Sequence, residues 1–197
     1  MSRAPEQQMT INGAKKLQAA DKIELIESRS TRPVAQQTAT YTLLAMLIAA
    51  AAALQIIESP LPRLLPWLKP GLANAMSLFA IIRISKRAGI LVAVLRTAVA
   101  AVFMGSFLSP LHLISTTGAF AAALLMAVIY RFIPGAGLGI VSVAGAVASN
   151  SAQLFAVQML FAGSMPFWLH LAAIVPVAVP AGLIVARVTQ ELLRRTA

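Results

Sequence analysis

Six stretches of nearly continuous apolar residues alternate with short polar links along this chain. A helix needs about 20 apolar residues to cross the hydrocarbon core of a bilayer, and most of the stretches approach this length. They predict helices over Thr38–Ile57, Gly71–Ile84, Ala88–Leu108, Leu111–Ile133, Leu138–Ala162 and Pro166–Ala186. Because the links are short, we expect helices that follow one another to pack antiparallel.

The pattern predicts an all-α integral membrane protein, a bundle of six transmembrane helices. Residues 38–187 would form the membrane domain, between a polar N-terminal tail over 1–37 and a basic C-terminal tail over 188–197. Composition agrees, since 59% of the residues are hydrophobic and only 11% are charged. Soluble domains carry about 25% charged residues, so the chain is not an ordinary soluble protein.

The net charge of +10 comes mainly from basic residues that flank the apolar stretches. Thirteen Lys and Arg fall on one side of the predicted bundle, and only Arg63 and Lys69 fall on the other. Basic residues collect on the cytoplasmic side of membrane proteins, so we expect both termini in the cytoplasm and a multi-pass protein of the cytoplasmic (inner) membrane. This pattern explains the charge without a nucleic-acid partner.

Cysteine is absent, which excludes disulfides and thiolate metal sites. The two histidines, His112 and His170, are far apart in the sequence, so we predict no metal site and no cofactor.

One arginine, Arg96, lies inside a predicted span as its ninth residue. An arginine in the middle of a membrane helix costs about 2.5 to 3.5 kcal/mol on insertion scales, so we expect Arg96 to have a polar partner. Two interpretations stay open. Arg96 either serves the structure, by binding carbonyl groups or extending towards the cytoplasm, or belongs to a buried site.

The fifth stretch carries Ser142, Ala146, Asn150 and Gln153 on one face of a helix. These polar groups either bond neighbouring helices together or line a solute pocket. In the predicted topology Glu58, Lys69, Asn74 and Gln153 all lie in the outer half of the membrane, where they converge on an outward-facing mouth. Glu58 is the only acid between Glu27 and Glu191, so we expect it to pair with Lys69 or Arg63.

The first stretch repeats alanine every fourth residue, at Ala45, Ala49 and Ala53. Small residues at this spacing let two membrane helices approach closely. This alanine seam either packs inside the bundle or docks another membrane subunit.

Two runs of residues resemble motifs of the Gx transporter family, also called heptaprenyl diphosphate synthase component I. The family pattern of a glutamate, a proline-rich link and Lys-x-Gly-Leu-Ala-Asn is matched by Glu58, Pro62, Pro66, Lys69, Gly71, Leu72, Ala73 and Asn74, and further on by Arg96 and Gly105. The second motif is matched by Ser142, Gly145, Ala146, Val147, Asn150 and Gln153. Many members have histidine where this chain has Ser149. The resemblance covers residues 40–186.

The resemblance implies an S component of an energy-coupling-factor transporter, which binds a small organic solute, such as a vitamin or cofactor precursor, near the outer face. The implied solute-binding residues are Glu58, Lys69, Asn74, Arg96, Asn150 and Gln153. Asn74 and the Pro-Gly turn before it would form a wall of the pocket. The alanine seam would dock an energy-coupling transmembrane subunit, which works with ATPases.

The synthase label fits the residues less well. Prenyl diphosphate chemistry uses Mg²⁺ held by carboxylates. This chain has a single aspartate, Asp21, in its polar tail. We therefore predict that it is not an enzyme. A non-catalytic membrane subunit, associated with polyprenyl diphosphate synthesis or with assembly of a redox complex, remains the alternative.

Overall fold

A computed structural model describes residues 34–59, 71–133, 135–161 and 167–196 of the chain. The chain divides into two units, Met1–Leu43 and Leu44–Ala197. Of the first unit the structure describes residues 34–43, where three threonine hydroxyls donate to backbone carbonyls four residues earlier in the helix. Lys69, Arg63 and most of the polar tail lie outside the described residues.

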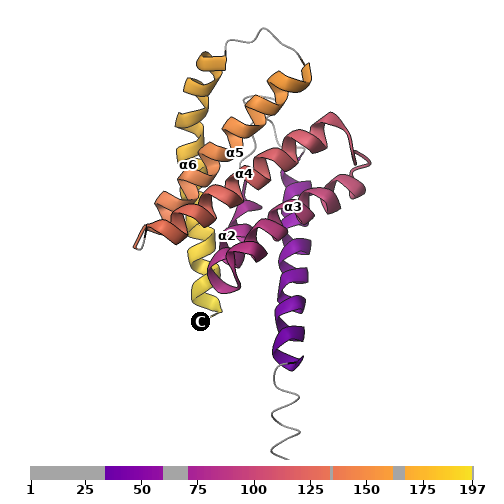
Figure 1. Cartoon of the computed structure of the whole chain (residues 1–197), viewed down its shortest axis with the longest axis vertical. Coiled ribbons are helices and arrows are strands. Elements are labelled where there is room, and N and C mark those ends of the chain that lie inside the picture. Colours follow the sequence, from indigo (N-terminus) through magenta and orange to yellow (C-terminus); the bar gives the residue numbers. More distant parts are fainter. Residues whose placement is uncertain (1–33, 60–70, 134, 162–166, 197) are drawn as a thin grey trace, which may run out of the picture. The chain divides into compact units, whose positions relative to one another are not determined.

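The described residues form six helices and no strand, which confirms the all-helical prediction. The first helix covers Val34–Glu58. The others are α2 (Asn74–Arg83), α3 (Lys86–Phe103), α4 (Pro110–Phe132), α5 (Leu138–Phe161) and α6 (Phe167–Arg195). Helices that follow one another from α2 to α6 are packed against each other, and α3, α4 and α5 run side by side in Figure 1.

Four segments are long and apolar enough to cross a membrane, namely Val34–Glu58, Pro110–Phe132, Leu138–Leu160 and Pro176–Arg195. With 10 residues, α2 is about 15 Å long, half the thickness of the hydrocarbon core. The 18 residues of α3 include Lys86, Arg87 and Arg96, so it is more charged than an ordinary span. The chain is a multi-pass membrane protein in which α2 and α3 are atypical helices.

The helix α2 lies at the centre of the described packing, since it contacts α3, α4 and α6. Its Phe79 and Ala80 pack with Leu47 and Ala51 of the first helix. On another side, Leu78 and Ile81 pack with residues of α4 and α5, among them Met126 and Val141. Burial on several sides explains why so short a helix is apolar, and it fixes the position of the α2 N-terminus.

The helix α3 ends at Phe103, five residues before the end of the predicted span at Leu108. Gly105 and Leu108 have φ angles of 63° and 61°, in the left-handed region, which a continuing helix does not allow. The next helix then begins with a normal cap, because Ser109 Oγ accepts a 3.3 Å hydrogen bond from the backbone N–H of His112.

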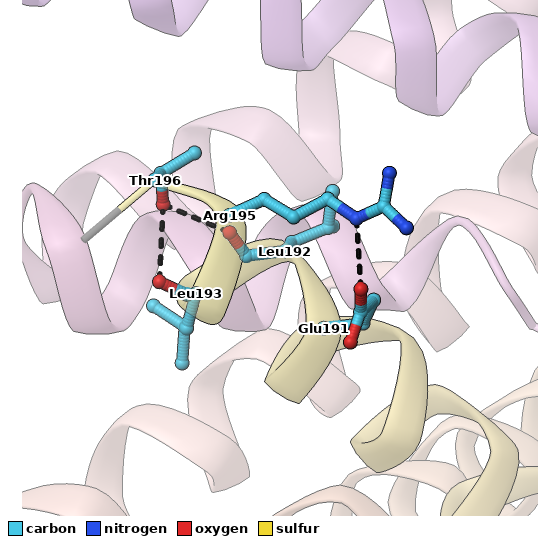
Figure 2. A network of polar contacts seen from close by, with 5 residues as sticks. All are labelled: Glu191, Leu192, Leu193, Arg195 and Thr196. Atoms are coloured by element: carbon cyan, nitrogen blue, oxygen red, sulfur yellow. Dashed lines mark hydrogen bonds and ion pairs between the residues drawn. The ribbon is translucent and has the colours of Figure 1, made fainter.

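The helix α6 continues beyond the predicted end of its span, Ala186, to Arg195. The residues after Ala186 are more polar than those before, but they remain helical and belong to the candidate span Pro176–Arg195. Thr189 is buried, and its hydroxyl donates to Val185 O at 2.8 Å and to Ala75 O of α2 at 3.4 Å. Figure 2 shows the last turn, where Arg195 Nε lies 2.8 Å from Glu191 Oε1.

Candidate functional site

The residues on either side of the link between the first helix and α2 meet at a buried carboxylate. Glu58, the last residue of the first helix, is 3% exposed. Backbone N–H groups of Leu72, Ala73 and Gly71, which precede α2, hydrogen-bond to its side chain. The residue at the N-cap of α2, Ala73, provides no side-chain cap. Glu58 therefore caps α2 from another helix, and its negative charge lies at the positive end of the α2 dipole.

The turn before α2 depends on its glycine. Gly71 has a φ of 73°, in the left-handed region that favours glycine. Its carbonyl accepts from the N–H of Asn74 at 2.8 Å, while its own N–H faces Glu58. The Pro-Gly sequence thus positions Asn74 as the first residue of α2.

Arg96 is 5% exposed in the middle of α3, and Asn74 is its partner. Arg96 Nη2 donates a hydrogen bond to Asn74 Oδ1. Glu58 also interacts electrostatically with Arg96. The partner expected for a membrane-embedded arginine is therefore present, and Arg96 belongs to a buried polar cluster with Glu58 and Asn74.

These three residues line a cavity of about 30 Å³, which we call the polar cavity. Residues of the first helix and of α2 to α6 surround it, including the turn before α2. The lining consists of Gln55, Glu58, Gly71, Asn74, Arg96, Ser115, Ala119, Ala146, Ser149, Asn150, Gln153 and Ala181. Five of the six predicted solute-binding residues are thus brought together, and the sixth, Lys69, lies outside the described residues.

The polar stripe of α5 divides into two parts. Ser142 Oγ donates a 2.7 Å hydrogen bond to Gly182 O of α6, so this residue connects two helices. Asn150 and Gln153 line the polar cavity instead. Gln153 Nε2 donates to Ser149 Oγ of its own helix at 3.1 Å. Ser142 thus bonds two helices together, whereas Asn150 and Gln153 line the polar cavity.

Close packing of α4 on α5 fixes the position of Gln153. A Cβ atom added to Gly118 of α4 would come within 2.5 Å of Gln153 Cγ. Another glycine, Gly145 of α5, lies as close to α4, because an added Cβ would come within 2.6 Å of Met126 Cγ. The small residues of α5 therefore allow the close helix approach that their sequence predicts.

Several polar atoms at the cavity have no hydrogen-bond partner among the described residues. They include Glu58 Oε1 and Arg96 Nε, both fully enclosed. The amide of Asn150 is buried, and it too makes no hydrogen bond to another described residue. Buried polar groups are normally paired, so unpaired ones around a cavity indicate a place for a polar guest.

Sequence reasoning missed three polar lining residues, Gln55, Ser115 and Ser149, as members of the site. Gln55 Nε2 donates to Ser115 Oγ at 3.3 Å, which connects the first helix to α4. Gln55 precedes Glu58 by three residues, so both lie on one face of the first helix, a signal that the spacing did contain. Ser115 lies in an otherwise apolar stretch with no comparable signal.

The alanine seam lies on the outside of the described residues. Ala45, Ala49 and Ala53 are all exposed, while Ala51 and Leu47 on the same helix are buried. The seam is therefore not part of the described core, and it remains available to a partner.

A family profile and a solved structure relate this chain to known proteins. The profile of a family described as heptaprenyl diphosphate synthase component I matches residues 47–192. No curated protein matches the sequence. A solved structure titled "Structure and mechanism of the S component of a bacterial ECF transporter" is similar with a TM-score of 0.63. The sequences are 20% identical, and the match covers 81% of this chain and 96% of the other, which shows a shared fold.

Proposed function

The chain belongs to the heptaprenyl diphosphate synthase component I family, and we propose that it is the membrane-embedded, solute-binding subunit of a transporter. The observation that carries this proposal is the polar cavity, where Glu58 Oε1 and Arg96 Nε are buried without a partner among the described residues. Burying such groups costs free energy unless a ligand pairs with them.

The shared fold supports the same function. The similar structure is an S component by its title, and the match covers most of both chains. We propose a small organic solute, such as a vitamin or cofactor precursor, because the resemblance of the sequence motifs to the family implies one. The five predicted residues that line the cavity would bind it, with Lys69 as a sixth residue from the link before α2.

A partner would supply the energy. The sequence contains no GxxxxGK[ST] phosphate loop, so ATP hydrolysis would belong to separate ATPases that act through an energy-coupling membrane subunit. We place this subunit at the alanine seam, because Ala45, Ala49 and Ala53 are exposed and small. The excess of basic residues on one side supports cytoplasmic termini and the inner membrane.

The family's description favours a second function, a non-catalytic membrane subunit of polyprenyl diphosphate synthesis. The sequence has six acidic residues, and among the described lining residues of the polar cavity Glu58 is the only one. One carboxylate is too few to hold the Mg²⁺ ions of diphosphate chemistry, so this chain would not be the catalytic component. A role in assembly of a redox complex has no feature of the described residues in its favour.

The test is to identify what the protein retains during purification. Full-length protein in lipid nanodiscs is denatured, and mass spectrometry identifies the released small molecules. We expect one solute in near-stoichiometric amount, strongly reduced in Asn150→Leu and unchanged in the control Arg131→Met, which alters an exposed arginine at the end of α4. Recovery of a prenyl synthase with no retained solute would favour the second function.

A further inference from the structure

Glu58 and Arg96 face the same cavity with opposite charges, yet they do not form an ion pair. Among the described residues, the only Lys or Arg nitrogen within 4.0 Å of a carboxylate oxygen belongs to the exposed pair Glu191 and Arg195. Glu58 and Arg96 are 3% and 5% exposed, so water outside the protein does not solvate them. Both charged groups are therefore available to a ligand only through the cavity that they line.

Each of the two charged groups has a hydrogen-bond partner among the described residues for part of its polar atoms and has one polar atom without a partner. The Glu58 carboxylate accepts from backbone N–H groups before α2, and Arg96 Nη2 donates to Asn74. What remains open among the described residues is Glu58 Oε1, which accepts, and Arg96 Nε, which donates. The nearby amide of Asn150 offers one further acceptor and one further donor.

We infer that the solute enters the polar cavity with a net-neutral group that carries a hydrogen-bond donor and an acceptor on neighbouring atoms, as a primary carboxamide or a lactam does. This inference rests on the proposed function. The N–H of such a group donates to Glu58 Oε1, and its carbonyl accepts from Arg96 Nε. With a volume of about 30 Å³, the cavity is large enough for one small polar group.

Among the described lining residues, the balance of charge disfavours a ligand group with a net charge. The described lining carries one negative and one positive side chain. An anionic group would meet the Glu58 carboxylate, and a cationic group would meet the Arg96 guanidinium, at short range and with little screening. None of the described lining residues is aromatic, so stacking on a ring is not how this part of the site recognises its ligand.

Small probes that fit the cavity test the inference directly. Acetamide, acetate, methylammonium and glycine are titrated into full-length protein in nanodiscs, and binding is followed by saturation-transfer NMR at constant ionic strength. We expect saturable binding of acetamide, with acetate and methylammonium at least about tenfold weaker. Tighter binding of acetate, methylammonium or zwitterionic glycine, or no saturable binding of acetamide, overturns the inference.

Two variants each remove one of the two charges from the cavity, and each should strengthen the binding of one charged probe. Glu58→Gln leaves the Arg96 charge unbalanced, so acetate should bind at least about tenfold more tightly than it does to the native protein. Arg96→Met leaves the Glu58 charge unbalanced, so methylammonium should gain instead. Arg131→Met, at an exposed position, should leave all four affinities unchanged. If Glu58→Gln and Arg96→Met both fold and neither changes the order of the probes, the inference is wrong.

The retained solute separates this inference from the function on which it rests. Suppose that a solute is retained in stoichiometric amount but that the group which enters the cavity is charged. The protein then binds a solute, and only the inference of a net-neutral group is wrong. If no solute is retained and no probe binds, both fail together.

Discussion

Arg96 in α3 donates a hydrogen bond to the side chain of Asn74, the first residue of α2, which lies 22 positions earlier in the chain. Both side chains are buried, and neither amide nor guanidinium has bulk water available. This bond joins two helices that line the polar cavity. It also means that Asn74 has a structural partner, whereas Asn150 does not among the described residues.

The bond between Asn74 and Arg96 should appear as coupling in a double-mutant cycle. A hydrogen bond to a charged group contributes about 1.5 to 3 kcal/mol, and removal of either partner leaves the other unsatisfied. We expect Asn74→Ala and Arg96→Met each to lower the free energy of unfolding, and the double variant to lose about 1.5 to 3 kcal/mol less than the sum. Unfolding in mixed micelles measures all three.

The matched control for this cycle pairs Arg96→Met with Ser142→Ala. Ser142 bonds to α6 at a different interface, so these two losses should add. Additive losses for Asn74 and Arg96 would mean that the two side chains do not interact in the membrane.

The alanine seam predicts opposite effects for two neighbouring substitutions. Ala49 is exposed and Ala51 is completely buried on the same helix. We expect Ala49→Leu to leave stability unchanged but to abolish recovery of an energy-coupling subunit in pull-down experiments. Ala51→Leu overfills the core and should lower the free energy of unfolding by about 1 to 3 kcal/mol. Normal recovery with Ala49→Leu would remove the seam as a docking surface.

The charge distribution predicts the orientation of the chain. In the predicted six-span topology thirteen basic residues fall on the side that holds both termini, so reporter fusions after Arg87 and after Ala197 should report the cytoplasm. A reporter inserted between Leu64 and Trp67 should report the outside. An external signal at Ala197 would reverse the orientation and place the polar cavity in the other half of the membrane.

Much of the site could be predicted because polar groups in apolar stretches are costly. Asn74, Arg96, Asn150 and Gln153 each interrupt an apolar segment, and hydrocarbon does not tolerate them without a partner. All four line one cavity. Glu58 could be found for a similar reason, as an acid at the end of a long apolar helix.

The partners within the site could not be predicted. Periodicity places Arg96 and Asn74 on their own helices, but it does not say which helices face each other. The predicted topology placed Asn74 with Glu58 and Gln153 in the outer half of the membrane but did not include Arg96 in this group. In the structure, Arg96 forms a hydrogen bond to Asn74. The continuation of α6 to Arg195 was missed for another reason, because hydropathy reports where a helix leaves the bilayer and not where it ends.

Alanine substitutions in the two parts of the α5 stripe, at Ser142 and at Asn150, should differ in their effects on solute affinity and on stability. The Asn150 amide lines the polar cavity without a partner among the described residues, so Asn150→Ala removes a ligand contact and no internal bond. We expect the affinity for the retained solute to fall roughly 5- to 150-fold, with little change in the unfolding transition. Ser142→Ala removes the bond to Gly182 and should lower the free energy of unfolding by about 1 kcal/mol with normal affinity.

Calorimetric titration and thermal unfolding of the same two variants measure both quantities. Since Ser142 and Asn150 are buried on the same helix, a general effect of altering α5 would act on both variants alike. If Asn150→Ala binds the solute normally but unfolds much earlier, its amide bonds helices together as Ser142 does. The binding site would then have to be sought first around Glu58 and Arg96.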